Sequence, residues 1–209
     1  MAERRAGDPG AVLDANDLRT DVRVDRASRL IVVCVDLSGS MGAPQRAEAA
    51  TGAVIGLLDD AYQRRHRVAL VSFRGEGAEI VLSPTSSVEI ARNRLGQLAT
   101  GGATPLAAGI RTALDVVARG GGSQHEQALL VVLTDGRATG SPDALARALD
   151  AAATVRNRGV PALVLDCEDG PVRLGLAASL AEAMGARHVR LSDHGGDVTA
   201  AITRDPRRP

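Results

Sequence analysis

The sequence of 209 residues contains no lysine, because all 25 of its basic side chains are arginine. A phosphate-binding P-loop needs a lysine beside the β- and γ-phosphates of its nucleotide. Enzymes that form Schiff bases need a lysine amine. The chain can therefore carry out neither of these chemistries by itself.

Aromatic side chains are almost absent as well, with one Tyr, one Phe and no Trp. Single-stranded nucleic acids bind many proteins by stacking their bases on such rings. The 25 acidic residues also balance the 25 basic ones. A net charge of zero gives no general attraction to nucleic acid or to a membrane surface, so we expect neither as a partner.

The sequence also lacks long apolar runs and a secretory signal. Its longest runs, 30–35 and 128–133, are far shorter than the roughly 20 residues of a membrane-spanning helix. The first ten residues are polar, unlike a signal peptide. Cys34 and Cys167 lie in separate apolar runs, which favours two buried free thiols over a disulfide or metal site. Together these features predict a cytoplasmic protein.

The length suits one α/β domain flanked by tails. Residues 1–27 are charged and show no apolar periodicity, so they predict a polar tail or linker. Residues 204–209 resemble them in composition and predict a second tail. We therefore expect a single domain over residues 28–203.

Six short apolar runs have the length of buried strands, at residues 30–35, 68–73, 79–82, 128–133, 162–165 and 188–191. Helical patterns lie between them, at residues 45–62, 88–98, 106–118, 142–156 and 172–184. Pro142 after Ser141 is typical of a helix start, while Gly159 and Gly185 are typical helix ends. The alternation predicts an α/β fold with a doubly wound, mostly parallel sheet, and the short turn 74–77 predicts one antiparallel edge strand.

Oxygen-bearing side chains follow two of the predicted strands. Asp36-Leu37-Ser38-Gly39-Ser40 comes at the end of the first, and Thr134-Asp135-Gly136 follows the fourth. If these strands are neighbours, Asp36 and Asp135 meet where the strand order reverses, which is where α/β sheets bind ligands. A third segment, the glycine turn before Pro105, predicts Thr104 as a helix N-cap.

This set of donors suits a hard cation. Mg²⁺ prefers octahedral oxygen coordination and keeps several waters. The predicted metal ligands are two carboxylates and three hydroxyls: Asp36, Ser38, Ser40, Thr104 and Asp135. A site of this kind leaves a position for a carboxylate from a partner protein. The simpler alternative is that each residue is only a cap or turn residue, but their joint occurrence at strand ends favours the metal site.

The same three segments resemble the metal-ion-dependent adhesion site of von Willebrand factor A, or integrin I, domains. The resemblance covers about residues 28–203. It implies a six-stranded, Rossmann-like sheet in which Ser38, Ser40 and Thr104 bind Mg²⁺ directly, with Mn²⁺ as a substitute. Asp36 and Asp135 would then act directly or through water.

A narrower resemblance comes from further segments, among them Asp60-Ala61-Tyr62-Gln63-Arg64-Arg65 and Thr134-Asp135-Gly136-Arg137. They are similar to the carboxyl-terminal domain of the magnesium-chelatase D subunit. That family inserts Mg²⁺ into protoporphyrin, and related assemblies insert Co²⁺ into a corrin precursor. The resemblance implies a non-catalytic component whose bound Mg²⁺ captures an acidic side chain on an AAA+ ATPase subunit or on the large chelatase subunit.

Other functions remain as alternatives. The same site would serve a stand-alone partner of a MoxR-type AAA+ ATPase that acts as a chaperone-like assembly factor. A secreted adhesion module is disfavoured because the sequence shows no signal peptide. Ser38 stands where an aspartyl-phosphate phosphatase needs a second carboxylate, and no G-x-S-x-G motif centres on Ser38 or Ser40. We therefore expect no catalytic site in this chain.

Overall fold

A computed structural model of the protein describes residues 28–42, 44–97, 99–120, 127–169 and 173–191. The predicted tails at 1–27 and 204–209 lie outside the described residues. The same holds for the last part of the predicted domain, so its boundaries at 28 and 203 stay predictions.

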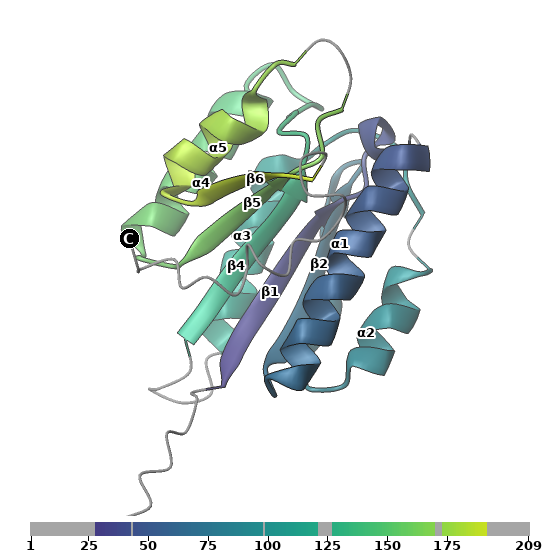
Figure 1. The fold of residues 1–209 in the computed structure, drawn as a ribbon. Coiled ribbons are helices and arrows are strands. Elements are labelled where there is room, and N and C mark those ends of the chain that lie inside the picture. Colours follow the sequence, from purple (N-terminus) through teal and green to yellow (C-terminus); the bar gives the residue numbers. More distant parts are fainter. Residues whose placement is uncertain (1–27, 43, 98, 121–126, 170–172, 192–209) are drawn as a thin grey trace, which may run out of the picture.

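Six strands form one sheet in the order β3-β2-β1-β4-β5-β6 (Figure 1). Their bounds are β1 Arg29–Asp36, β2 Arg67–Arg74, β3 Gly77–Thr85, β4 Gln127–Thr134, β5 Ala162–Asp166 and β6 Arg187–Arg190. Four of the five neighbouring pairs are parallel, and only the β2–β3 hairpin is antiparallel. The predicted doubly wound sheet with one antiparallel edge strand is confirmed.

Helices cover both faces of this sheet (Figure 1). They are α1 Pro44–Gln63, α2 Val88–Leu95, α3 Leu106–Gly120, α4 Ala144–Asn157 and α5 Leu176–Met184, and a short 3-10 helix, η2, spans Gly39–Gly42. Helices α1 and α2 pack on one face, while α3, α4 and α5 pack on the other. No helix in the described ranges has the length and apolar character needed to cross a membrane.

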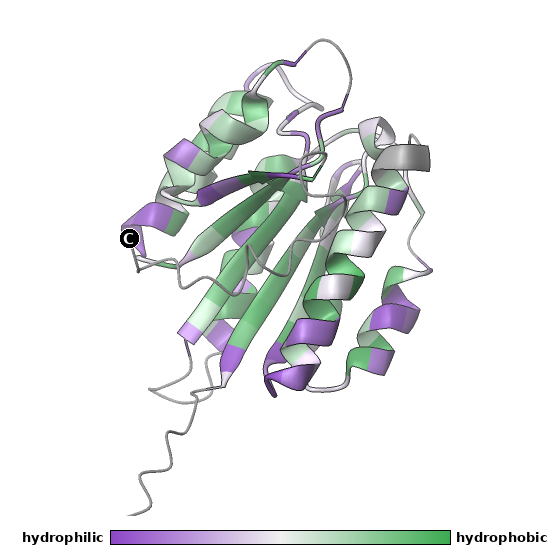
Figure 2. Ribbon diagram, viewed as in Figure 1, coloured by the Kyte–Doolittle hydropathy of each residue, from purple (hydrophilic) through white to green (hydrophobic). Residues whose placement is uncertain are grey.

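Two apolar layers hold the helices against the sheet, because successive side chains of a strand point to opposite faces. In β1, Ile31 and Val33 pack towards α1 and α2. Val32 and Cys34 pack on the opposite side, towards α3, α4 and α5. Figure 2 shows this pattern as apolar strands between helices that carry both apolar and hydrophilic residues. Cys34 and Cys167 are both buried and free, as predicted.

The only phenylalanine lies where α3 packs tightly against the sheet. Phe73 in β2 is fully buried, and a Cβ atom built on Gly109 of α3 would come within 2.4 Å of its ring. Any larger residue at position 109 would therefore push the helix away from β2. Gly109 brings α3, and with it the loop that precedes α3, close to the centre of the sheet.

The start of α4 differs from the prediction, because the helix begins at Ala144 instead of Pro142. Ser141 and Asp143 form a turn in which the Ser141 hydroxyl donates a hydrogen bond of 2.8 Å to the Asp143 carboxylate. The amide of Ala144 donates to the carbonyl of Ser141. Pro142 thus lies in the turn before the helix.

The start of α5 also differs, since it lies at Leu176 and not at residue 172. The buried carboxylate of Glu168, just after β5, accepts hydrogen bonds from the amides of Leu174 at 2.7 Å and Gly175 at 3.1 Å. These bonds hold the chain outside the helix until residue 176. The predicted helix ends are confirmed, because Gly159 and Gly185 both have a φ of 63° at the ends of α4 and α5.

The strand order places a switch point between β1 and β4. The chain first moves outward from β1 to β2 and β3, and then returns to lay β4 on the other side of β1. Loops that follow β1 and β4 therefore leave the sheet in opposite directions at its carboxyl edge. This crevice is where open α/β sheets bind their ligands.

Candidate metal site

The first part of the candidate site is the loop that follows β1. Asp36 is buried at the end of the strand, and its Oδ1 accepts a hydrogen bond of 2.9 Å from the amide of Ser38. The hydroxyls of Ser38 and Ser40 lie 3.1 Å apart. The amide of Met41 donates to the carbonyl of Ser38 and so starts the short helix η2. The tight turn therefore gathers one carboxylate and two hydroxyls within a few residues.

The second part comes from the end of β4, which is the neighbour of β1. The hydroxyl of Thr134 donates a hydrogen bond of 2.8 Å to Asp36 Oδ2 and accepts one of 3.0 Å from the amide of Gly136. Asp135 is buried, and its Oδ1 accepts a bond of 3.0 Å from the amide of Arg137. The Arg137 Nε atom lies 3.4 Å from Asp135 Oδ2. The expected meeting of the two strand ends is thus present.

The third part is the glycine loop before α3, which is hydrogen bonded to the loop after β1. The amide of Gly101 donates to Leu37 O at 2.8 Å, and the amide of Gly39 donates to Gly102 O at 3.0 Å. Gly102 has a φ of 84°, and a Cβ atom there would come within 3.0 Å of the backbone of Gly75. Glycine at 102 therefore lets the loop lie against both the first loop and the β2–β3 turn.

Thr104 is buried at the end of this loop. Its amide donates to the hydroxyl of Thr139 at 2.8 Å, and its carbonyl accepts from the Thr139 amide at 3.1 Å. The expectation that Thr104 is the N-cap of α3 is wrong, because the helix starts at Leu106 and the carbonyl of Pro105 accepts the bond from Gly109. Two bonds to Thr139 instead fix Thr104 against the loop that follows β4.

Burial dominates the electrostatics of Asp36. It raises the pKa of this carboxyl from 3.8 to about 6, even though hydrogen bonds from Ser38 and Thr134 lower it. The negative charge of Asp135 raises it further. Two buried carboxylates that repel one another are stabilised when a cation neutralises them. The electrostatics of this pair therefore favour a bound cation.

The donors fit a hard cation only if hydroxyl oxygens take part. Within the described ranges, no group of three or more His, Cys, Asp or Glu side chains is placed to hold a metal ion. The two carboxylates would need neutral oxygens from Ser38, Ser40 and Thr104 beside them. Carboxylate, hydroxyl and water oxygens are the donors that Mg²⁺ and Mn²⁺ accept.

Two neighbours of the site were not among the predicted ligands. Thr134 joins the two strand ends through its hydroxyl, and Thr139 holds the backbone of Thr104. Thr134 lies in the segment Thr134-Asp135-Gly136, which the sequence analysis names. Its contact with Asp36 could be predicted only from the register between β1 and β4. Nothing in the sequence marks Thr139, because its role depends on how the loops cross.

The described histidines, His66 and His188, form hydrogen bonds with residues other than the candidate ligands. The ring of His66 accepts a hydrogen bond from the amide of Arg29 at the start of β1. His188 lies 2.9 Å from Asp166 through its Nε2 atom. His125 and His194 lie outside the described residues. The described part of the chain thus pairs neither serine of the loop with these two histidines.

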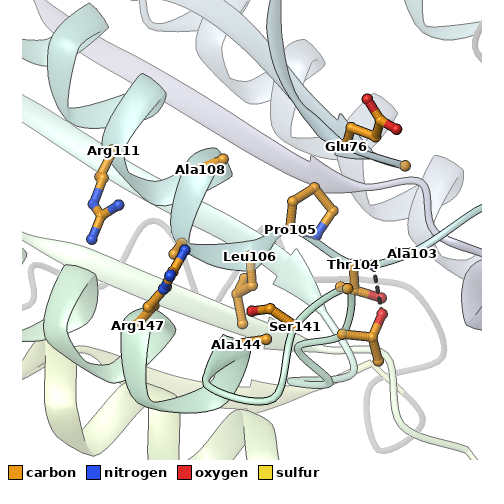
Figure 3. Close-up of a pocket in the computed structure, with 14 residues that line it drawn as sticks. Glu76, Ala103, Thr104, Pro105, Leu106, Ala108, Arg111, Ser141, Ala144 and Arg147 are labelled. Atoms are coloured by element: carbon orange, nitrogen blue, oxygen red, sulfur yellow. Dashed lines mark hydrogen bonds between the residues drawn. The ribbon is translucent and has the colours of Figure 1, made fainter.

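A cleft of about 420 Å³ opens beside Thr104 (Figure 3). We call it the α3–α4 cleft; it is lined by residues 75–76, 103–108, 111, 139–141, 144 and 147. It runs from the β2–β3 turn, past the start of α3, to the first turns of α4. Thr104 therefore belongs both to the candidate metal site and to this cleft.

Comparisons with known proteins place this geometry in a family. The model of the von Willebrand factor type A domain matches residues 31–138. An uncharacterized protein of Mycobacterium tuberculosis is 49% identical over 84% of this chain. The 60 kDa subunit of the magnesium chelatase of Cereibacter sphaeroides is 42% identical over 82% of it. The chain spans only 28% and 32% of the lengths of these two relatives.

A shorter relative is an uncharacterized protein of Methanocaldococcus jannaschii. It is 31% identical over 73% of this chain, and the match covers 90% of that protein. This relative is therefore little longer than the matched domain itself.

Solved structures share the fold at low sequence identity. The von Willebrand factor type A structure from Catenulispora acidiphila matches 83% of this chain and 42% of that one, with a TM-score of 0.58 and 21% identity. The manganese-loaded TRAP protein of Plasmodium vivax matches 84% of this chain and 73% of that one, with a TM-score of 0.62 and 16% identity. With a family model that matches more than half of its length and a fold that agrees, the chain belongs to the von Willebrand factor type A domain family.

Proposed function

We propose that this chain is a non-catalytic, Mg²⁺-dependent protein-binding domain that works as a D-subunit-like component of an ATP-dependent magnesium or cobalt chelatase. The observation that carries the proposal is the joining of three loops at the β1–β4 switch point. They gather two buried carboxylates and buried or half-buried hydroxyls at one edge of the sheet. Homology to magnesium-chelatase subunits over most of the chain supports this choice of assembly.

In this proposal the hydroxyls of Ser38, Ser40 and Thr104 hold Mg²⁺, with Mn²⁺ as a substitute. Asp36 and Asp135 supply the negative charge, directly or through water. When bound, the cation supplies a positive centre that accepts a carboxylate from a partner. Thr134 keeps Asp36 in place through its hydrogen bond of 2.8 Å. The manganese-loaded relative of the same fold is consistent with a divalent cation here.

The partner in this proposal is an AAA+ ATPase subunit or the large chelatase subunit, which presents an acidic side chain to the metal. The chain has no lysine with which to run a P-loop, so ATP hydrolysis belongs to the partner. The proposal places this protein in the cytoplasm, alongside the ATPase that drives the assembly. Its own role in this proposal is to bind and hold, through a site of carboxylate and hydroxyl oxygens in which Ser38 Oγ lies 3.1 Å from Ser40 Oγ.

Binding to purified chelatase subunits tests the proposal. The full chain is titrated with the ATPase subunit and with the large subunit, in Mg²⁺ and in EDTA, by calorimetry. Binding to at least one subunit in Mg²⁺ is expected, with a loss of about 100-fold or more in EDTA. Asp135→Asn should reproduce that loss in Mg²⁺, whereas Asp150→Asn, on the outer face of α4, should bind like the wild type. Equal affinity with and without Mg²⁺ would falsify the proposal.

One observation favours a second function. The match to the relative from Methanocaldococcus jannaschii covers 90% of that protein, so a domain of this size exists outside a long subunit. The chain would then serve as a stand-alone partner of a MoxR-type AAA+ ATPase, as a chaperone-like assembly factor. Mg²⁺-dependent binding to such an ATPase, with no affinity for either chelatase subunit, would select this function over the first.

A further inference from the structure

The α3–α4 cleft is a second surface, next to the candidate metal site, that the metal does not account for. It begins at Thr104 and extends for about 420 Å³ between the starts of α3 and α4. Ligand pockets commonly have volumes of about 300–1,000 Å³. The cleft is therefore large enough to hold several side chains of a partner.

Positively and negatively charged side chains lie at opposite ends of the cleft. Arg111 of α3 and Arg147 of α4 point towards one another from the two helices, while Glu76 lies at the other end, on the β2–β3 turn (Figure 3). Arg147 forms an ion pair of 2.7 Å with Asp143 through its Nε atom. No hydrogen bond or ion pair joins Arg111 to another of the described residues. The end between the helices is thus positively charged and open to a carboxylate.

The wall between these arginines and Thr104 is made of small side chains. Ala107, Ala108 and Ala144 line it together with Pro105 and Leu106. Small side chains allow the main chain of a bound segment to come close to the helices. The guanidinium groups beyond them would pair with acidic side chains in the two-pronged geometry that arginine favours.

We propose that the α3–α4 cleft binds an acidic segment of the partner protein, with Arg111 and Arg147 as the residues that hold its carboxylates. The inference rests on the proposed function in one respect, namely that the partner is a protein. The segment continues from the residue that reaches the metal, because Thr104 borders both surfaces. The metal site supplies dependence on Mg²⁺, and the cleft selects partners whose acidic residues continue past the first one.

The test uses fluorescein-labelled octaglutamate as the probe and octaglutamine as its neutral counterpart. Binding to the full chain is followed by fluorescence anisotropy in Mg²⁺ at low ionic strength. We expect octaglutamate to bind and octaglutamine not to bind. Arg111→Gln and Arg147→Gln should each weaken binding by about 3-fold, as exposed ion pairs do, and the double variant by about 10-fold because separate contacts add.

Matched controls remove the same charge from the same helices. Arg119→Gln near the end of α3 and Arg158→Gln at the end of α4 lie outside the cleft. They should change the affinity by less than about 2-fold, alone or together. Equal losses in the cleft pair and the control pair would overturn the inference. So would a wild-type protein that does not bind octaglutamate.

The same titration in EDTA separates this inference from the proposed function. Binding that needs the two arginines but not Mg²⁺ supports the cleft and counts against the metal-dependent part of the function. Binding that needs Mg²⁺ but not the arginines overturns the inference about the cleft and supports the metal-dependent part of the function. Loss in both the arginine variants and EDTA supports the two together. Circular dichroism of each variant verifies that the fold is intact.

Discussion

The single residue with the most perturbed environment in the site is Asp36. Folding removes its carboxylate from water and places it near the carboxylate of Asp135. Burial raises its pKa from 3.8 to about 6. Between these two values the folded protein holds a proton that the unfolded chain has already released. Without metal, this residue therefore destabilises the fold increasingly as the pH rises from about 4 to about 6.

The first prediction concerns this pH dependence in metal-free buffer. Asp36→Asn should remove most of the loss of stability between about pH 4 and pH 7. The difference in unfolding free energy between wild type and variant should grow over that range to about 3 kcal/mol at most, because a shift of one pKa unit corresponds to about 1.4 kcal/mol. Urea unfolding in EDTA at several pH values measures it.

Asp150→Asn is the control for this series, because Asp150 is exposed on α4. Its unfolding free energy should follow the wild-type curve at every pH. If the curve of Asp36→Asn also runs parallel to the wild type, Asp36 does not titrate near pH 6 in the folded protein.

The second prediction concerns Thr134, whose hydroxyl donates to Asp36 and accepts from Gly136. Thr134→Val keeps the shape but leaves both buried partners with one hydrogen bond fewer. We expect a loss of about 2–3 kcal/mol in unfolding free energy, and a weaker affinity for Mg²⁺. Thr154→Val on α4 is the control, since its hydroxyl donates to the carbonyl of Asp150 in its own helix. Similar losses in both variants would show that Thr134 has no special role.

Among the elements of the fold, α5 is fixed by contacts from two strand ends. Gly136 follows β4 with a φ of 80°, and a Cβ atom there would lie 2.2 Å from the amide nitrogen of Ala177 in α5. Glu168 follows β5 and holds the amides of Leu174 and Gly175 before the helix. The position of α5 is thus coupled to the loop that carries Asp135.

The third prediction compares two glycines that share a left-handed backbone but differ in their surroundings. Gly159→Ala should lower the free energy of unfolding by about 1 kcal/mol, since φ is 63° and nothing lies within 4 Å of the added Cβ. Gly136→Ala should lower the free energy of unfolding by at least about 3 kcal/mol, because α5 must move away from the added methyl group. Thermal unfolding measures both, and hydrogen exchange should quicken in α5 only for Gly136→Ala. Equal losses of unfolding free energy in the two variants would mean that α5 can shift without destabilising the fold.

The elements differ in how well the sequence predicts them, and the reason is physical. Runs such as 30–35 and 128–133 are apolar on both faces, so they show buried strands directly. The start of α5 depends on Glu168, which reaches forward to Leu174 and Gly175, and a local pattern does not show such a contact. The same applies to α4, where the Ser141 hydroxyl bonds Asp143 and keeps Pro142 outside the helix.

The candidate site divides in the same way. Its strand-end residues, Asp36 and Asp135, follow from the position of the strands alone. The contact of Thr134 with Asp36 needs the register of β1 against β4, and the α3–α4 cleft needs the packing of two helices. The neighbours of side chains such as Thr139 and Arg111 are set by that packing, so a local sequence pattern does not show them. The sequence therefore predicts the ligand set but neither its support nor its neighbouring surface.

At the scale of the whole molecule, a bound cation should stabilise the fold, because the site exists only when the sheet is formed. The fourth prediction is that Mg²⁺ at about 100 times its dissociation constant adds about 2.7 kcal/mol. For a protein of this size the melting temperature should rise by about 5–10 °C. Differential scanning calorimetry in Mg²⁺ and in EDTA measures the rise.

Asp135→Asn should melt at the same temperature in Mg²⁺ and in EDTA, while Asp150→Asn should keep the full rise. A rise of equal size in both variants would indicate that Mg²⁺ acts elsewhere on the protein. Mn²⁺ in place of Mg²⁺ should give a rise of the same sign in the wild type, since both ions accept oxygen ligands.

The pairing of β1 with β4 has a consequence for the order of folding. Thr134 and Asp36 are 98 residues apart in the chain, so their contact forms only when a very long loop closes, which is slow. A chain still emerging from the ribosome carries the first loop, with Asp36, Ser38 and Ser40, long before it carries Asp135. Metal capture should therefore appear late during synthesis and report that the centre of the sheet has closed.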